Sequence, residues 1–367
     1  MARVIYFASS YGIGLTALLA EKACALKELG SSEFLFVSGE REQFPGLLVK
    51  LQRHQVRQVA IPGLDDHGGF FRLVRAFNTE VQEFSPNIVH VQTNWQLAIA
   101  AVARRLFGHG YAIVSTIHGY RHNHRIRSFV ARLAIGIGMK FWADRVLVPS
   151  SFLRRKFAMV DNKSSLLFLG VDDRYFERGS VVSREGPARI IYPAEFRKGK
   201  KHEDLIRTVG KVIEGLGSGN IELYLPGTGV LLERCQALCQ RLGIGHAVVF
   251  PGFIDREKLL DLYMKCQFVV VPAGVETFGL TIAEGLVLGR VVVSRPVGVA
   301  QDVIVHGKTG CLYETERELE VLLCSLIGDK GGCEELSRNA LKAREVFRWR
   351  NICEQYERTL ADIQHAA

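Results

Sequence analysis

Short runs of apolar, β-branched residues alternate along the chain with longer stretches of helical periodicity. Helices are expected at residues 15–29, 72–84 and 95–107 and along a basic stretch that follows Ile117. The strands expected between them are Val4–Ala8, Glu33–Val37, Val59–Ile61, Ile88–Gln92, Ala112–Ile117 and Arg145–Pro149. This alternation is typical of a mostly parallel sheet covered by helices.

A second series of the same kind follows the polar, glycine-bearing stretch Glu177–Ala188. Its expected strands are Arg189–Pro193, Ile221–Leu225, Ala247–Phe250, Phe268–Val271 and Val291–Ser294, with helices at 202–215, 230–242, 256–265 and 277–288. The pattern predicts an α/β protein of two Rossmann-like domains, residues 1–178 and 179–345, followed by an amphipathic helix near Trp349–Ile363. Ligands bind beyond the carboxyl ends of such strands, so two facing halves would form a central cleft.

The composition excludes several classes of protein. The chain has 367 residues, 48% of them hydrophobic, which is enough for a core in each of two domains. It has no uncharged apolar run of the roughly 20 residues that a membrane span needs, and its first apolar stretch runs into a glycine turn, unlike a signal peptide. Eight scattered cysteines without a CxxC or CxxH pattern indicate buried or half-buried thiols in a reducing cytosol and no zinc site.

Positive charge is concentrated in one part of the chain. Residues 104–156 contain eleven Lys or Arg and one acid, a net +10, whereas the whole chain carries +9. Basic side chains alternate there with large apolar ones, so the segment could lie on an anionic membrane surface. The alternative is a buried helix whose arginines reach solvent, and no recognised module indicates nucleic acid. The residues expected at the membrane are Arg125, Arg127, Phe129, Arg132, Lys140 and Trp142, with Leu133 toward the acyl chains.

Two glycine turns stand at equivalent places in the two halves. Gly12 and Gly14 belong to a GxGxxA pattern after the first strand, and Glu40 lies where a ribose-binding acid would sit in an NAD site. The second turn is Pro226–Gly229. A single dinucleotide site would not account for both turns, whereas two turns that approach phosphate or sugar across a shared cleft would.

The segment Glu276–Glu284 carries the most specific pattern of charge. If a helix begins at Thr277, the N–H groups of Phe278, Gly279 and Leu280 form an anion site at its start. Eight helical residues span roughly 12 Å, about the reach from a ribose across a diphosphate to a sugar. A carboxylate at each end could then hold two diols. The alternative is a capped surface helix with an incidental glutamate in its second turn.

A set of motifs along the chain resembles those of the retaining GT-B glycosyltransferases of family four. Weaker matches lie at Thr116–His118, Val148–Ser151, Gly170–Asp172 and Lys200. The stronger matches, in order along the chain, are Leu225–Gly229, Leu242–Gly243, Val248–Phe253, Leu259–Tyr263, Val271–Pro272, Glu276–Leu280, Glu284–Gly285, Gly289, Pro296–Gly298 and His306–Gly310. The resemblance implies a GT-B fold whose terminal helix, residues 346–367, crosses back to an acceptor-binding first domain, while residues 179–345 bind the nucleotide-sugar donor.

The resemblance also implies roles for individual residues. Glu276 would grip the transferred sugar, Glu284 the ribose, and Lys200 the diphosphate, whose developing charge it would offset. His118 would reach the transferred sugar from the first domain. The other implied donor-binding residues are Thr277, Phe278, Gly279, Leu280, Gly227, Gly229 and Phe253, and Gly12 and Gly14 would shape the donor–acceptor boundary.

One position departs from the family pattern. Glu195 stands where the family carries a phosphate-binding arginine, five residues before Lys200. Arg197 or Lys198 could substitute for its charge, and Arg197 is taken as the hypothesis. The sequence has no Asp-x-Asp motif and so does not require a metal. Neither a metal nor another cofactor is expected beyond the donor, a UDP- or GDP-sugar.

We therefore expect a cytoplasmic enzyme at the inner face of the plasma membrane. It would move a hexose, with retention, from a nucleotide-diphosphate sugar to a glycan or glycolipid acceptor in cell-envelope polysaccharide or lipopolysaccharide assembly. The alternatives are a nucleotide-sugar epimerase or hydrolase on the same fold and a non-catalytic nucleotide-binding scaffold.

Overall fold

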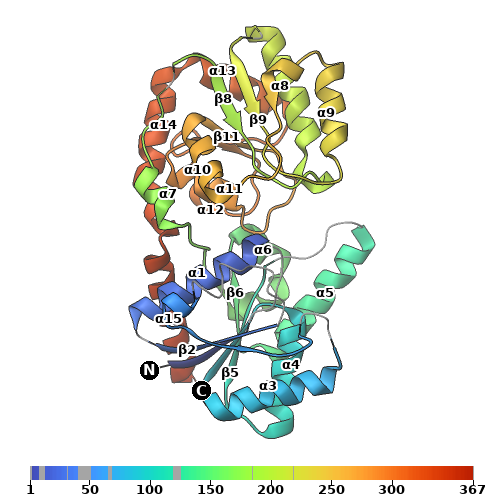
Figure 1. The fold of residues 1–367 in the computed structure, drawn as a ribbon, viewed down its shortest axis with the longest axis vertical. Coiled ribbons are helices and arrows are strands. Elements are labelled where there is room, and N and C mark those ends of the chain that lie inside the picture. The colour runs from blue at the N-terminus through green and yellow to red at the C-terminus, as the bar shows by residue number, and fades with distance from the viewer. Residues whose placement is uncertain are drawn as a thin grey trace. The chain divides into compact units, whose positions relative to one another are not determined.

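The chain divides into two compact units, Met1–Gly170 with Arg348–Ala367 (unit 1) and Val171–Phe347 (unit 2), each built on its own sheet (Figure 1). The chain crosses between them at Gly170/Val171 and Phe347/Arg348, against the expected 178/179 and 345/346. The computed structural model describes residues 2–7, 13–30, 32–39, 51–64, 68–118, 125–183, 185–217 and 219–366, and of 13–18, 125–130 and 365–366 the backbone alone.

Unit 1 has a seven-stranded parallel sheet in the order β3-β2-β1-β4-β5-β6-β7. Central β1 pairs with β2 and β4, so that Val4 faces Phe34 on one side and Ile88 on the other. The strands are β1 Ala2–Phe7, β2 Ser32–Ser38, β3 Arg57–Ala60, β4 Ile88–Val91, β5 Ala112–Thr116, β6 Arg145–Val148 and β7 Ser164–Leu166. The first six lie where the apolar runs predicted them, and β7 adds a short edge strand.

Side chains of β1 alternate between the two faces of this sheet. Tyr6 packs with Leu19 and other residues of α1, whereas Ile5 and Phe7 lie in the larger core with Phe77 of α3. The helices are α1 Ile13–Leu29, α3 Phe70–Phe84, α4 Asn94–Phe107, α5 Arg125–Trp142, α6 Ser151–Lys156 and α15 Trp349–Ala366, with a 3₁₀ turn, η1, at Ala158–Lys163.

The C-terminal helix α15 belongs to unit 1 and packs against α1 (Figure 1). Ser32 donates to Glu357 at 2.6 Å, and the Tyr356 hydroxyl lies 2.7 Å from Nδ1 of His90. Tyr356 is fully buried, so the last helix completes the core of unit 1.

Unit 2 has a six-stranded parallel sheet in the order β10-β9-β8-β11-β12-β13. Its central strand β11 is buried on both faces and pairs with β8 and β12. The strands are β8 Ala188–Ile191, β9 Ile221–Tyr224, β10 Val248–Val249, β11 Phe268–Val271, β12 Val291–Ser294 and β13 Cys311–Leu312. A strand order that starts in the centre and switches direction is the Rossmann-like arrangement that the sequence predicts.

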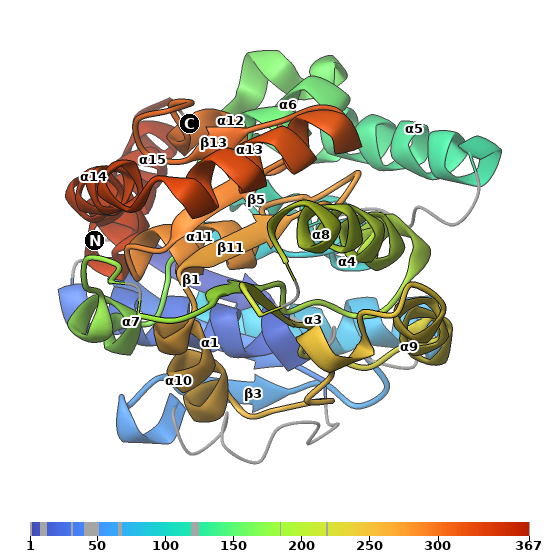
Figure 2. The ribbon, with the colours of Figure 1, turned by 90° about the horizontal axis from the view of Figure 1, so that it is seen from above.

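Helices surround the sheet of unit 2, and Figure 2 shows several of them nearly end-on. α13 packs on α8, and Thr315 caps α13 by accepting from the Glu318 amide at 3.2 Å. The helices are α7 Asp173–Arg178, α8 His202–Leu216, α9 Leu232–Arg241, α10 Arg256–Lys265, α11 Leu280–Val287, α12 Ala300–Val303, α13 Glu316–Gly328 and α14 Lys330–Ala343, with 3₁₀ turns η2 Lys198–Lys200, η3 Gly245–Ala247 and η4 Arg344–Phe347.

The structure bears on two features of the composition. All eight cysteines are free thiols, and all except the half-buried Cys324 are buried. Among the described residues, none of the helices combines the length and the apolar character needed to cross a membrane.

Candidate functional site

The start of α11 lies three residues later than the sequence predicts. Gly279 adopts a left-handed conformation, φ 90°, and the helix begins at Leu280. The carbonyl of Phe278 accepts from the Val299 amide at 2.6 Å, which holds this part of the loop outside the helix. The amides at the helix start are therefore those of Leu280 and Thr281, in place of the expected Phe278, Gly279 and Leu280. Phe278 is instead buried, with its ring near Phe347.

Lys200 and Glu276 form an ion pair beside this helix. Their Nζ and Oε1 atoms lie 2.5 Å apart, and the side chains are 17% and 14% exposed. Lys200 closes the turn η2, where its carbonyl accepts from the Tyr192 hydroxyl at 3.1 Å. Residues 76 positions apart in the sequence, both expected in catalysis, are thus brought together.

Glu284 lies in the second turn of α11. Its Oε2 accepts a hydrogen bond of 2.9 Å from the hydroxyl of Tyr263 on α10. Burial, and secondarily the Glu284 charge, raises the pKa of Tyr263 well above its ordinary value, so this phenol stays a donor. Thr281 donates to the carbonyl of Pro193 at 3.2 Å and so ties the helix start to the end of β8. Sequence reasoning missed Tyr263 as a partner of Glu284, although it lies inside one of the matched motifs.

The glycines of the 226–229 turn are required by packing within unit 2. A Cβ at Gly227 would lie 2.2 Å from the Ala194 carbonyl oxygen, and one at Gly229 would lie 2.7 Å from that of Phe196. Both glycines have φ near 143°, which other residues rarely adopt. The turn is thereby held against residues 194–196 and beside Gly252, whose carbonyl accepts from the Gly227 amide. Phe253, the next residue, is 69% exposed.

The departure at Glu195 has a local counterpart. Oε2 of Glu195 lies 3.1 Å from Nε of Arg197, and the two side chains are 66% and 41% exposed. Arg197, the expected substitute for the family arginine, is therefore already paired with the carboxylate of Glu195. Whether it binds phosphate stays a prediction.

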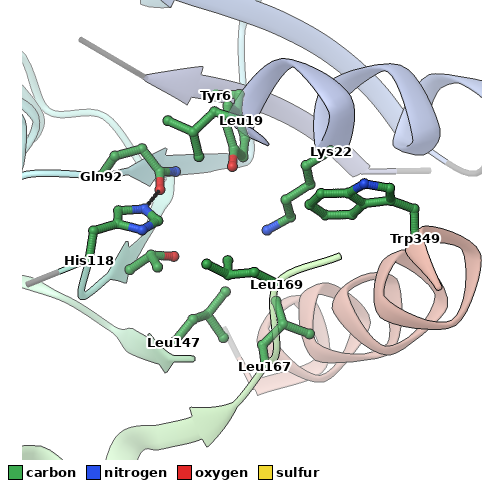
Figure 3. A pocket seen from close by; sticks show the side chains of 10 residues that line it. Tyr6, Leu19, Lys22, Gln92, His118, Leu147, Leu167, Leu169 and Trp349 are labelled. Carbon is green, nitrogen blue, oxygen red and sulfur yellow. Dashed lines mark hydrogen bonds between the residues drawn. The ribbon is translucent and has the colours of Figure 1, made fainter. Parts of the chain in front are cut away.

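His118 lies beyond the carboxyl end of β5 in unit 1. Its Nε2 is 2.6 Å from Oε1 of Gln92, which follows β4 (Figure 3). Burial, and secondarily the cation of Lys22, lowers the pKa of His118 to about 3, so the imidazole is neutral at physiological pH. Sequence reasoning missed both Gln92 and Lys22. The signal for Lys22 was its place on the apolar face of α1, one turn from Leu19 and Leu26.

The glycine pattern after β1 is described only in part. α1 begins at Ile13, so Gly14 lies inside its first turn, and Gly12 lies outside the described residues. Glu40 also lies outside them. Within the described part of the chain, no cluster of three or more His, Cys, Asp or Glu side chains could hold a metal ion.

The basic segment forms α5, as expected, but its described surface is mainly apolar. Leu133, Ile137 and Phe141, four residues apart, are 42%, 44% and 72% exposed, while Met139 on the opposite face is buried. Trp142 is 44% exposed. Of the other residues expected at a membrane, Lys140 is exposed and Arg132 is half-buried. The side chains of Arg125, Arg127 and Phe129 are not among those that the structure describes.

Family models match both units. A model described as Glycosyltransferase Family 4 matches residues 14–174, and one described as Glycosyl transferases group 1 matches residues 173–343. The chain is 29% identical over 181 residues to an uncharacterized glycosyltransferase of Methanocaldococcus jannaschii, covering 48% of this chain and 46% of that protein. It is 26% identical over 294 residues to N-acetyl-alpha-D-glucosaminyl L-malate synthase of Bacillus anthracis, covering 76% of this chain and 75% of the relative.

A solved structure with the same fold is that of Anabaena HepE in complex with UDP and glucose. It superimposes with a TM-score of 0.79 at 17% identity, over 99% of this chain and 100% of that one. This likeness shows the fold, and the two family models between them span residues 14–343. The chain therefore belongs to the GT-B glycosyltransferases of family four, with its C-terminal unit in glycosyl transferases group 1.

Proposed function

We propose that this glycosyltransferase is retaining and moves a hexose from a nucleotide-diphosphate sugar to a glycan or glycolipid acceptor. The observation that carries the proposal is the Lys200–Glu276 pair beside the start of α11. A cation, a carboxylate and free helix amides within one loop system suit a donor that joins a diphosphate to a sugar. UDP is the nucleotide that we favour for the donor, because HepE, which has the same fold, was solved with UDP and glucose bound.

Each group would have a separate task. Lys200 has three N–H donors, so it can keep Glu276 and still donate to the departing diphosphate. Glu276 would accept from hydroxyls of the transferred sugar, and Glu284, oriented by Tyr263, from the ribose. The amides of Leu280 and Thr281 would donate to the phosphates, and Gly279, which lacks a side chain, would let them approach the helix start.

The reaction exchanges one bond at the sugar's anomeric carbon for another. The bond from that carbon to the phosphate oxygen breaks, and the acceptor oxygen bonds to the same carbon from the leaving group's face. The acceptor's proton passes to the departing phosphate, whose negative charge Lys200 and the helix amides would stabilise. Neutral His118, held by Gln92, would contact the transferred sugar from unit 1. This scheme needs no metal.

The Glu276→Gln variant tests the assignment. It keeps the shape of the side chain but removes the charge that pairs with Lys200, so we expect turnover to fall at least about a hundredfold. UDP binding, measured by calorimetry, should stay within a few-fold. The control is Glu334→Gln on α14, which breaks an exposed pair with Arg338 at 2.9 Å. Unchanged turnover would reject the site.

Product analysis separates the alternatives. With donor and no acceptor, an epimerase or hydrolase releases a changed or free sugar, and a transferase accumulates little product. A scaffold binds UDP but turns over no donor. The pairing of Glu195 with Arg197 is the observation that favours a scaffold, because it adds an acid near the expected diphosphate site.

We further propose that unit 1 docks on an anionic membrane through a lipid-docking surface. This surface consists of exposed apolar residues of α4 and α5: Leu106, Phe107, Leu133, Ile137, Phe141 and Trp142. A groove of about 980 Å³ lies between the ends of these helices, and its wall carries Arg105 and an Arg104 that is paired with Asp144. Aromatic and aliphatic side chains with arginines at their border suit the boundary between acyl chains and anionic headgroups. The acceptor would then be lipid-linked and met at the cytoplasmic face.

Sedimentation with vesicles tests this part alone. Binding to vesicles that contain phosphatidylglycerol should weaken as salt screens the basic residues. Phe141→Asp should abolish binding, whereas Val321→Asp, at an equally apolar exposed position of α13 in unit 2, should not. Equal loss in both variants, or no binding at low salt, would reject membrane docking and leave the transferase assignment untouched.

A further inference from the structure

A small cavity in unit 1 is lined by a buried lysine and by polar groups that lack hydrogen-bond partners among the described residues. It has a volume of about 10 Å³ and lies at the carboxyl edge of the sheet, under α1 and the start of α15 (Figure 3). Leucines form its apolar walls: Leu19, Leu147, Leu167 and Leu169. The amine of Lys22 and the hydroxyl of Tyr6 point into this space, with Gln92 and His118 on the far side.

Most of the polar atoms around the cavity are hydrogen-bond donors. Lys22 is 5% exposed, and its amine lies 4.0 Å from the centre of the Tyr356 ring, an interaction that offsets part of its charge. The Tyr6 hydroxyl, Gln92 Nε2 and Trp349 Nε1 are buried with no hydrogen-bond partner in the described part of the chain. None of the described residues that line the cavity is acidic.

A buried cation is costly unless a negative charge compensates it, and the described lining of the cavity offers no carboxylate. A water molecule would fill the cavity and could donate to the Tyr6 oxygen or to Nδ1 of His118, but it would leave the charge of Lys22 uncompensated. An anion accepts from every donor and cancels the charge. The volume suits a particle about the size of one water, too small for a carboxylate or phosphate group.

We propose that this cavity binds a single monoatomic anion, chloride in the cell, held by Lys22 with the Tyr6 hydroxyl and the Gln92 amide. The anion requires the protonated amine, so binding must weaken in alkaline solution. The titratable groups that face Lys22 are Tyr6 on β1, His90 on β4, His118 after β5, and Cys353 and Tyr356 on α15. All of these are neutral at physiological pH, so among the described groups that face the cavity Lys22 supplies the charge.

Thermal unfolding in different sodium salts at constant ionic strength tests the proposal. Chloride and bromide should raise the melting temperature with saturation, whereas gluconate, which is too large for the cavity, should not. The Lys22→Met variant should lose the halide effect, and Lys27→Met, at an exposed position on the same helix, should keep it. Identical curves in all salts, or a halide effect retained in Lys22→Met, would overturn the proposal.

Two further measurements do not depend on the folding of Lys22→Met. The Tyr6→Phe variant removes one donor and should weaken halide binding about fivefold, the effect of one ordinary hydrogen bond. Crystals of the full chain soaked in bromide should show an anomalous peak beside the Lys22 amine. A peak only on the outer surface would overturn the proposal. Both readouts report binding, so they stand apart from the success or failure of the proposed transferase function.

Discussion

Lys200 of unit 2 and Lys22 of unit 1 are both withdrawn from solvent but meet opposite surroundings. Lys200 has a carboxylate 2.5 Å from its amine and keeps partial access to solvent. Lys22 is more deeply buried, against aromatic rings and orphaned donors. The positive charge of a lysine that is paired with a carboxylate stays compensated whether or not a second anion is bound. Such a lysine suits a substrate that binds and dissociates in every catalytic cycle. Lys22 has no carboxylate among the described residues that line its cavity, so we expect a permanently bound anion there.

The largest expected difference between the two lysines is that replacing Lys200 should slow turnover. Lys200→Ala removes the cation expected to stabilise the departing diphosphate, so kcat should fall about 10²- to 10³-fold. Lys211→Ala, an exposed lysine of α8 near Glu320, is the matched control and should leave kcat unchanged. The measurement is steady-state transfer from UDP-sugar. A decrease of less than threefold would place the diphosphate elsewhere.

A second effect, on stability, should belong to Lys22. Burial lowers its pKa from 10.5 to about 8. Between these values the unfolded chain binds more protons than the folded one, so in chloride-free buffer the free energy of unfolding should rise with pH. The integrated gain is about 3 kcal/mol, complete by pH 10.5 and absent below pH 8.

Denaturant titrations of wild type and Lys22→Met at several pH values measure this gain. The stability difference between the two should change by about 3 kcal/mol across the window, since every other group titrates alike in both. The free energy of unfolding of Lys27→Met should change with pH in the same way as that of the wild type. Parallel curves for Lys22→Met would mean that Lys22 keeps its ordinary affinity for protons.

The smallest effect concerns the acid that replaces the family arginine. Glu195→Gln frees Arg197 and removes a negative charge near the expected diphosphate, so donor affinity should rise a few-fold. An exposed pair is worth at most about 1 kcal/mol, which bounds the gain. Calorimetry with UDP measures it, with Glu185→Gln as the control at an exposed position. Weaker binding would indicate that Glu195 itself contacts the donor.

Sequence patterns predicted the fold well where burial determines the pattern. The buried strand Phe268–Val271 and the helix 256–265 have the expected bounds, because apolar periodicity and the Asp255 cap both act locally. The start of α11 was wrong by three residues. Its position depends on a hydrogen bond from the Val299 amide to the Phe278 carbonyl, a contact between distant residues that no local pattern records.

The candidate site was predictable only as a set of residue types. The motifs placed Lys200 and Glu276 in one site, and the structure adds that they form an ion pair. Lys22 was overlooked because a lysine in a helix is ordinarily exposed, whereas here it packs between Tyr6 of β1 and Tyr356 of α15. Gln92 was overlooked because its contact with His118 joins the ends of two different strands.

The division of unit 1 into two segments also orders the events of synthesis. Arg348–Ala367 leaves the ribosome after the whole of Val171–Phe347, so unit 2 can fold while unit 1 still lacks α15. Until then Tyr356 is missing from the Lys22 amine and Ser32 has no Glu357. Until α15 is synthesised, the core of unit 1 is incomplete and the apolar face that α15 covers is exposed. We expect chaperones to bind unit 1 during this interval.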